Sequence, residues 1–192
     1  MASSSKVHRL VGIALLAAIG YVLMMFSFPI IPAFPFLKLD LSDLVVLLGG
    51  LLYGPAGGIG GAFIRGLVHF SLTGGGGGNL IGDLAAFIAS VGFLLPVVYT
   101  IRGKHSLLRQ IEGLVLGTAS LTLVMSVLNW LVITPMYMAV FNFNLGMSLT
   151  RYVLIGVVPF NLIKGIVVSV AFFAIAKALA PWLARREIQP SH

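Results

Sequence analysis

The sequence predicts an all-α membrane protein, folded as a bundle of six transmembrane helices with both termini in the cytoplasm. Of its 192 residues, 59% are hydrophobic and only 9% are charged, and the mean hydropathy is +1.08. A soluble domain carries about a quarter charged residues. The apolar residues form runs near the length of about 20 residues that a helix needs to cross a bilayer. The basic residues gather at the ends of these runs, as expected where Lys and Arg mark the cytoplasmic side.

The chain divides into six expected spans within a single integral membrane domain. They cover residues 10–28, 44–54, 56–73, 80–100, 113–140 and 152–179. The apolar stretch Leu44–Thr73 decides the count, because Gly54-Pro55 interrupts it and proline disrupts a helix interior. Two short spans here bring the basic groups of the amino terminus, residues 102–109 and the carboxyl-terminal tail to one side. One span would separate them and remove the positive-inside bias.

Composition and spacing exclude several function classes. The chain has no cysteine, which excludes disulfides, thiolate metal sites and cysteine nucleophiles. We expect no separate nucleotide-hydrolysing domain at this length, so energy must come from a partner or a gradient. The net charge of +7 does not indicate nucleic-acid binding, because topology explains where the basic residues lie. His69 has no second ligand at metal spacing, so we expect no metal site.

The sixth span carries the most informative polar residues. Asn161 and Lys164 are three residues apart and share one face of a helix. A charged side chain at membrane depth costs at least a few kcal/mol unless it meets a partner or a water-filled cavity. Lys164 therefore either forms a salt bridge to another span or contacts a polar ligand, and we favour the ligand.

Polar groups of three spans reach the same depth. Asn129 lies 17 residues beyond Glu112, or about 25 Å along a helix from the cytoplasmic side. The same arithmetic puts Lys164 about 20 Å above that side, and Asn79 and Asp83 begin the fourth span at its outer end. The proline-rich loop 29–43 and the glycine run 74–78 lie on that side too. We therefore expect a site open to the exterior and closed by a lid.

Structural roles for these residues stay open as alternatives. Asn129 could serve only to hydrogen-bond a neighbouring helix, and Asp40 and Asp43 could be solvated loop carboxylates. Asp83 could neutralise Lys164 or Arg65. Ala14 and Ala18 form a small-xxx-small pair in the first span, which suits either internal packing or docking to a separate membrane subunit.

Four segments together resemble a known family. They are the loop Phe36–Asp43, the segment Leu48–Pro55, the segment Leu128–Tyr137, and Pro159–Gly165 with its Asn161 and Lys164. With the basic amino terminus and the alanine-rich first span, this order is similar to the riboflavin-specific S components of energy-coupling factor (ECF) transporters. The resemblance covers nearly the whole chain.

The resemblance implies a substrate-binding subunit of the bacterial cell membrane rather than an enzyme. Such a subunit captures riboflavin from outside as a transported ligand, not a cofactor, and associates with a transmembrane scaffold subunit and two cytoplasmic ATPases. By the resemblance, Ala14 and Ala18 match the motif that contacts the scaffold. Asn129, Asn161 and Lys164 match positions expected to hydrogen-bond the flavin, and the first loop matches the lid. The third span departs from the family pattern, so we transfer no ligand contact to it.

The remaining candidates follow from flavin chemistry. An asparagine amide both donates and accepts along the uracil-like edge of the ring, and an ammonium donates to a carbonyl. Asp40 is expected to accept from ribityl hydroxyls, and Phe36 and Leu39 to cover the ring. Asp83 and Asn79 complete the predicted site.

Three alternatives remain for the function. Another vitamin is the first, although an anionic one such as pantothenate would require additional Arg or Lys. An intramembrane enzyme is the second, but Ser71 and His69 make a poor nucleophile–base pair. A gradient-driven carrier is the third, and the chain shows no internal duplication that would favour it.

Overall fold

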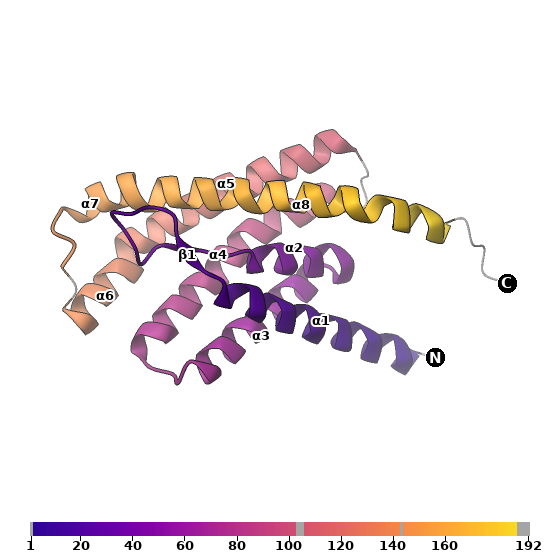
Figure 1. Ribbon diagram of the computed structural model, residues 1–192, viewed down its shortest axis with the longest axis horizontal. Helices are drawn as coiled ribbons and strands as arrows, with labels where there is room; N and C mark the ends of the chain where they lie inside the picture. Colours follow the sequence, from indigo (N-terminus) through magenta and orange to yellow (C-terminus); the bar gives the residue numbers. More distant parts are fainter. Residues whose placement is uncertain (1, 103–105, 143, 188–192) are drawn as a thin grey trace.

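A computed structural model describes the backbone of residues 2–102, 106–142 and 144–187, and the side chains of residues 6–102, 106–142 and 144–176. Within these ranges the protein is a bundle of helices, with a short two-stranded sheet in the first loop (Figure 1). The elements are α1 (Ala2–Met25), β1 (Phe28–Pro29), β2 (Lys38–Leu39), α2 (Ser42–Tyr53), α3 (Pro55–Leu72), α4 (Gly77–Ile101), α5 (Leu107–Leu128), η1 (Asn129–Ile133), α6 (Thr134–Phe141), α7 (Leu149–Tyr152), η2 (Val153–Val157) and α8 (Val158–Glu187).

The all-α membrane class is confirmed. Among the described residues, four helical stretches are long and apolar enough to cross a membrane, and α2 is a shorter apolar helix. The four stretches are Lys6–Met25, Gly77–Ile101, Leu107–Phe141 and Leu149–Ala176. The amino-terminal end of α1 and the carboxyl-terminal end of α8 point toward the same end of the bundle (Figure 1). Lys104, one of the predicted cytoplasmic cations, lies outside the described residues.

The predicted break at Gly54-Pro55 is confirmed. Helix α2 ends at Tyr53, Gly54 adopts φ +83°, and Pro55 begins α3. The positive φ suits glycine, and proline suits the first turn of a helix. The two helices then pack glycine against glycine, because a Cβ at Gly58 would lie 3.0 Å from the backbone of Gly50.

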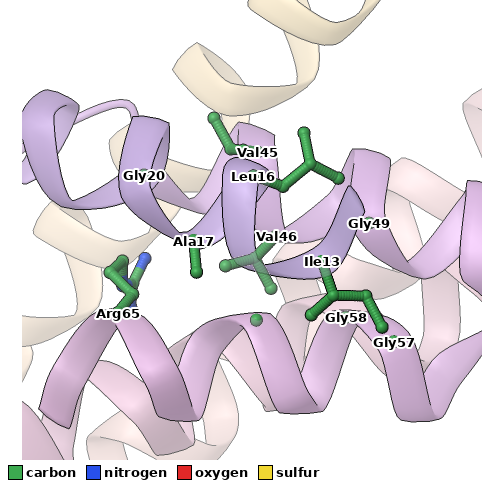
Figure 2. A pocket seen from close by; sticks show the side chains of 11 residues that line it. Ile13, Leu16, Ala17, Gly20, Val45, Val46, Gly49, Gly57, Gly58 and Arg65 are labelled. Atoms are coloured by element: carbon green, nitrogen blue, oxygen red, sulfur yellow. The ribbon is translucent and has the colours of Figure 1, made fainter. Parts of the chain in front are cut away.

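Helix α1 packs on this α2–α3 hairpin through one face. Figure 2 shows the narrow space between the three helices, about 10 Å³, with Ile13, Ala17 and Gly20 of α1 facing it. Ala14 and Ala18 lie on the other face of α1 and are exposed. Internal packing, one of the two roles considered for this pair, is therefore excluded within the described chain.

The main core joins α2, α3, α4, α5 and α8. Its fully buried members include Leu47, Leu94, Val97 and Leu121. Helices α4 and α5 approach closely at Gly117, where a Cβ would lie 2.9 Å from the carbonyl oxygen of Phe93. Helices α4 and α5 are therefore tightly packed at Gly117, and the cavity described below lies at the other end of the bundle.

The first loop is structured and has an apolar underside. Its two strands pair antiparallel, with Phe28 opposite Leu39. Phe34 is buried against Tyr152, with ring centroids 5.2 Å apart, and its ring touches the helix at Gly156. Helix α2 begins at Ser42 without a side-chain cap hydrogen bond. Asp40 Oδ1 instead accepts from the Ser42 backbone N–H at 2.8 Å.

Two long helical stretches, Leu107–Phe141 and Leu149–Ala176, each contain one π-helical turn just before a proline. In η1 the N–H of Thr134 bonds the carbonyl of Asn129, and in η2 the N–H of Val158 bonds that of Val153. Pro135 and Pro159 follow directly and lack the N–H of a regular helical turn. Each proline is therefore preceded by a widened turn, a feature often found at functional sites.

Candidate ligand-binding site

A cavity of about 690 Å³ lies between α3, α4, η1, α6, α8 and the first loop. Seven of the eight predicted site residues line it: Phe36, Asp40, Asn79, Asp83, Asn129, Asn161 and Lys164. The eighth, Leu39, is only 2% exposed and lies outside the lining, where Leu37 takes its place. The cavity therefore joins residues that are up to 128 positions apart in the sequence, from Phe36 to Lys164.

One carboxylate organises the inner end of the cavity. Asp43 Oδ2 lies 2.8 Å from Lys164 Nζ, and Asp43 Oδ1 lies 3.1 Å from Arg65 Nη1. Ser90 donates to the same Oδ1 and accepts from Arg65 Nη2 at 2.8 Å. All four side chains are buried. Such a pair of cations is tolerable at membrane depth because the carboxylate lies between them.

This network corrects three sequence-based expectations. Lys164 was expected to be held for a ligand rather than for a salt bridge, but its ammonium contacts both Asp43 and the cavity. Asp43 is 3% exposed and is no solvated loop carboxylate. Asp83 neutralises neither Lys164 nor Arg65, since its ion-pair partner is His69. An ammonium has three donors, so the salt bridge leaves Lys164 able to donate into the cavity.

The two buried amides flank this ammonium. Asn129 Nδ2 donates to the Met125 carbonyl at 2.9 Å, and its Oδ1 accepts from Thr134 at 3.2 Å. Asn161 Nδ2 donates to the Val157 carbonyl at 2.8 Å. Each amide carries two N–H donors and an oxygen with two lone pairs. These bonds orient both side chains and still leave donor and acceptor capacity for a ligand.

Aromatic side chains and the glycine run border the outer end. Phe36 lies 5.8 Å from the ring of Tyr152, and both line the cavity. The Tyr137 hydroxyl donates to the Gly78 carbonyl at 2.9 Å, which ties α6 to the start of α4. Asn79 Nδ2 contacts Thr73 Oγ1 at 3.1 Å and the Gly75 carbonyl at 3.3 Å. Asn79 therefore shapes the glycine turn as well as lining the cavity.

The structure also reveals residues that the sequence reasoning missed. Arg65 was paired only with Asp83 as an alternative, whereas its carboxylate partner is Asp43; a cation at that depth requires one. The chain has only five acidic residues, so few carboxylates could have been the partner of Arg65. Thr134, Tyr137 and Tyr152 line the cavity without having been singled out, because hydroxyls and aromatics are common in membrane helices.

Residues 8–176 match the sequence profile of the ECF transporter substrate-specific component. The chain belongs to this family. As an S component it is a transporter subunit and not an enzyme. A solved S component of a bacterial ECF transporter is 35% identical, with a TM-score of 0.79 over 93% of this chain and 98% of that one.

Named relatives of this S component are riboflavin transporters. FmnP of Bacillus subtilis (strain 168) is 36% identical over 191 residues, covering 97% of this chain and all of the relative. RibU of Staphylococcus aureus (strain TCH60) is 36% identical over 178 residues, 92% of this chain and 93% of the relative. RibU of Streptococcus thermophilus (strain ATCC BAA-250 / LMG 18311) is 38% identical over 170 residues, 88% and 81% of the two chains.

Proposed function

We propose that this S component binds riboflavin from the exterior of a bacterial plasma membrane and delivers it inward with an ATP-driven ECF module. The observation that carries the proposal is the cavity, where Asn129, Asn161 and Lys164 converge beneath the first loop. Its volume of about 690 Å³ falls within the roughly 300–1,000 Å³ typical of small-molecule sites. Relatives that align over nearly the whole chain carry the name riboflavin transporter.

The lining suits a flat, uncharged ligand with one polar edge. Asn161 and Asn129 offer donors and acceptors side by side, which matches the alternating carbonyl and N–H groups of the flavin ring edge. Lys164 donates to a carbonyl or ring nitrogen, while Asp43 balances its charge. Phe36 and Tyr152 supply aromatic surface for the ring. A neutral ligand therefore needs no further cation in the site.

Charge supports an exterior opening and six spans. Arg9 donates to the Tyr53 carbonyl at 2.8 Å, and the Arg102 guanidinium lies against Gly54. These cations share the end where α1 begins and α2 turns into α3, which the positive-inside rule assigns to the cytoplasm. Lys38 lines the cavity at the opposite end. Both termini are then cytoplasmic, and the cavity faces outward.

The short helix α2 explains why the outer half is hollow. With 12 residues it rises about 18 Å, against a hydrocarbon thickness of about 30 Å. Its first turn carries Asp43 at the inner end of the cavity. The space above that turn is left to the ligand and is covered by the first loop, which acts as the lid.

The exposed face of α1 is the proposed contact with the scaffold subunit. Ala14 and Ala18 are exposed there while Ala17 and Gly20 are buried. Small residues at i and i+4 let another membrane helix approach closely. Two cytoplasmic ATPases acting through that scaffold would supply the energy for reorienting the bundle and releasing riboflavin inside.

The absorbance spectrum of freshly purified protein tests the proposal. Protein from flavin-producing cells is expected to be yellow, with flavin bands in the visible range and quenched flavin fluorescence. A colourless protein that also fails to quench added riboflavin would contradict it. Pantothenate, the alternative vitamin, absorbs no visible light and serves as the competitor: it should not displace bound flavin.

A further inference from the structure

A second polar pair lines the cavity and takes no part in the Asp43 network. His69 of α3 and Asp83 of α4 approach within 2.7 Å, measured from Nδ1 to Oδ1. Both line the cavity, and the Asp83 side chain is only 8% exposed. We propose that Asp83, held by His69, binds the hydroxyls of the ribityl chain and selects riboflavin over its 5′-phosphate. This inference rests on the proposed function.

Position along α4 separates this pair from the ring-binding end. Asp83 and Ser90 are seven residues apart, which is two helical turns and returns to the same face about 10 Å further along the axis. Ser90 contacts Asp43, which in turn holds Lys164. The pair therefore lies about 10 Å nearer the glycine run than the ammonium does. A ligand whose ring edge meets Lys164 extends its chain toward Asp83.

The carboxylate has unused hydrogen-bonding capacity. Among the described residues, Asp83 Oδ2 is buried and has no hydrogen-bond partner, and a buried acceptor without a donor costs free energy. The terminal torsion of aspartate is broad, so a small rotation turns either oxygen toward the cavity. A hydroxyl group supplies the missing donor. Asp40, the residue first expected to bind the ribityl chain, already accepts from the Ser42 backbone N–H and hydroxyl through Oδ1.

Hydroxyls fit this pair better than a metal ion. Among the described residues, no group of three or more His, Cys, Asp or Glu side chains could hold a metal. A terminal phosphate carries a charge of about −1.5 to −2 and would lie close to the Asp83 carboxylate in the outer part of the cavity. Asp83 therefore repels the phosphorylated ligand and accepts a hydrogen bond from the neutral polyol. Lys38, which also lines the cavity, attracts a phosphate but is unchanged in an Asp83 variant.

Titration of three flavins against purified Asp83→Asn tests the inference. Riboflavin, its 5′-phosphate and lumiflavin, which has a methyl group in place of the ribityl chain, are followed by fluorescence quenching. Losing a charged acceptor is expected to weaken riboflavin about tenfold and to leave lumiflavin within twofold. The ratio of phosphate to riboflavin dissociation constants should fall by at least about tenfold. His69→Gln should shift the same ratio in the same direction, by less.

Two controls separate the possible failures. Asn161→Ala should weaken riboflavin and lumiflavin equally, because it acts on the ring; if wild-type protein binds neither flavin, the proposed function itself fails. If Asp83→Asn weakens riboflavin and lumiflavin by the same factor, Asp83 is only a structural partner of His69 and the inference is overturned. Unchanged riboflavin affinity in that variant, or an unchanged phosphate-to-riboflavin ratio, overturns it as well.

Discussion

Where α2 turns into α3, the helices touch through glycine; at the opposite end, some of the same helices are held apart around polar side chains. The glycine-packed end comprises Gly49, Gly50, Gly57 and Gly58. A Cβ at Gly58 would lie 2.7 Å from the Leu94 side chain and 3.0 Å from Gly50, and a Cβ at Gly50 or Gly57 would meet a side chain within 2.5 Å. At the cavity end, Lys164, Asn161 and Asn129 border about 690 Å³ of space. In the proposed function, stability and binding are therefore carried by different ends of one bundle.

The two ends meet at Asp43, which belongs to α2 but contacts Arg65 of α3 and Lys164 of α8. Buried ion pairs contribute little net stability, but removing one partner is costly because a charge is left uncompensated. Asp43 thus couples the two ends: it holds the hairpin to α8 and sets the position of the ammonium. Substitutions at either end test whether the two roles are separate.

The largest effect is expected from Asp43→Asn. It leaves two buried cations without their carboxylate and should lower the free energy of unfolding by about 3–5 kcal/mol, with loss of flavin binding. Thermal unfolding in detergent, followed by circular dichroism, measures the change. Asp40→Asn is the matched control, since Asp40 accepts from Ser42; it should cost about 1 kcal/mol. Equal melting of the two variants would contradict the coupling role of Asp43.

Gly58→Ala should destabilise the protein without altering the cavity. The added methyl group meets Leu94 and the Gly50 backbone, and overpacking of this kind costs about 1–3 kcal/mol. The riboflavin affinity of the folded protein should stay within twofold. Gly60→Ala is the control on the same helix, because a Cβ there meets nothing within 4 Å. A loss of affinity as large as the loss of stability would show that the two ends are not separable.

Phe34→Ala should speed ligand release as well as lower stability, because the buried Phe34 ring holds the first loop against the bundle. Phe34 holds the first loop onto η2 through Tyr152, and an aromatic pair contributes about 0.5–1.5 kcal/mol beyond its buried area. Riboflavin dissociation should be about fivefold faster, measured by stopped-flow fluorescence. If the dissociation rate is unchanged, the first loop does not act as the lid.

The smallest effect on the isolated subunit is expected from Ala14→Leu and Ala18→Leu. Both positions are exposed, so melting temperature and flavin affinity should match the wild type. Co-purification with the scaffold subunit should nevertheless be lost, because larger side chains prevent close helix approach. Ile19→Leu, exposed on the same helix but about 100° around the axis from Ala18, is the control and should retain the partner. Retained co-purification of the alanine variants would exclude this face as the contact.

Sequence patterns predicted the fold well because each pattern acts locally. The Gly54-Pro55 break needed only backbone preferences, and the shared depth of Asn129, Asn161 and Lys164 needed only the rise of a helix. The ion pairs escaped prediction because they depend on which helices become neighbours. Asp43 could be joined to Arg65 and Lys164 only once α2, α3 and α8 were placed together. The His69–Asp83 pair depends on the α3–α4 contact in the same way.

Titration of riboflavin by isothermal calorimetry into wild-type protein, Asn161→Ala and Lys164→Met tests the central claim most directly. If the amide and the ammonium bind the ring edge, each variant should weaken binding by about tenfold or more. The melting temperature of Asn161→Ala should stay close to that of the wild type, because the Asn161 side chain donates to the Val157 carbonyl of its own helix. Unchanged riboflavin affinity in both variants would contradict the claim that the cavity end is the flavin site.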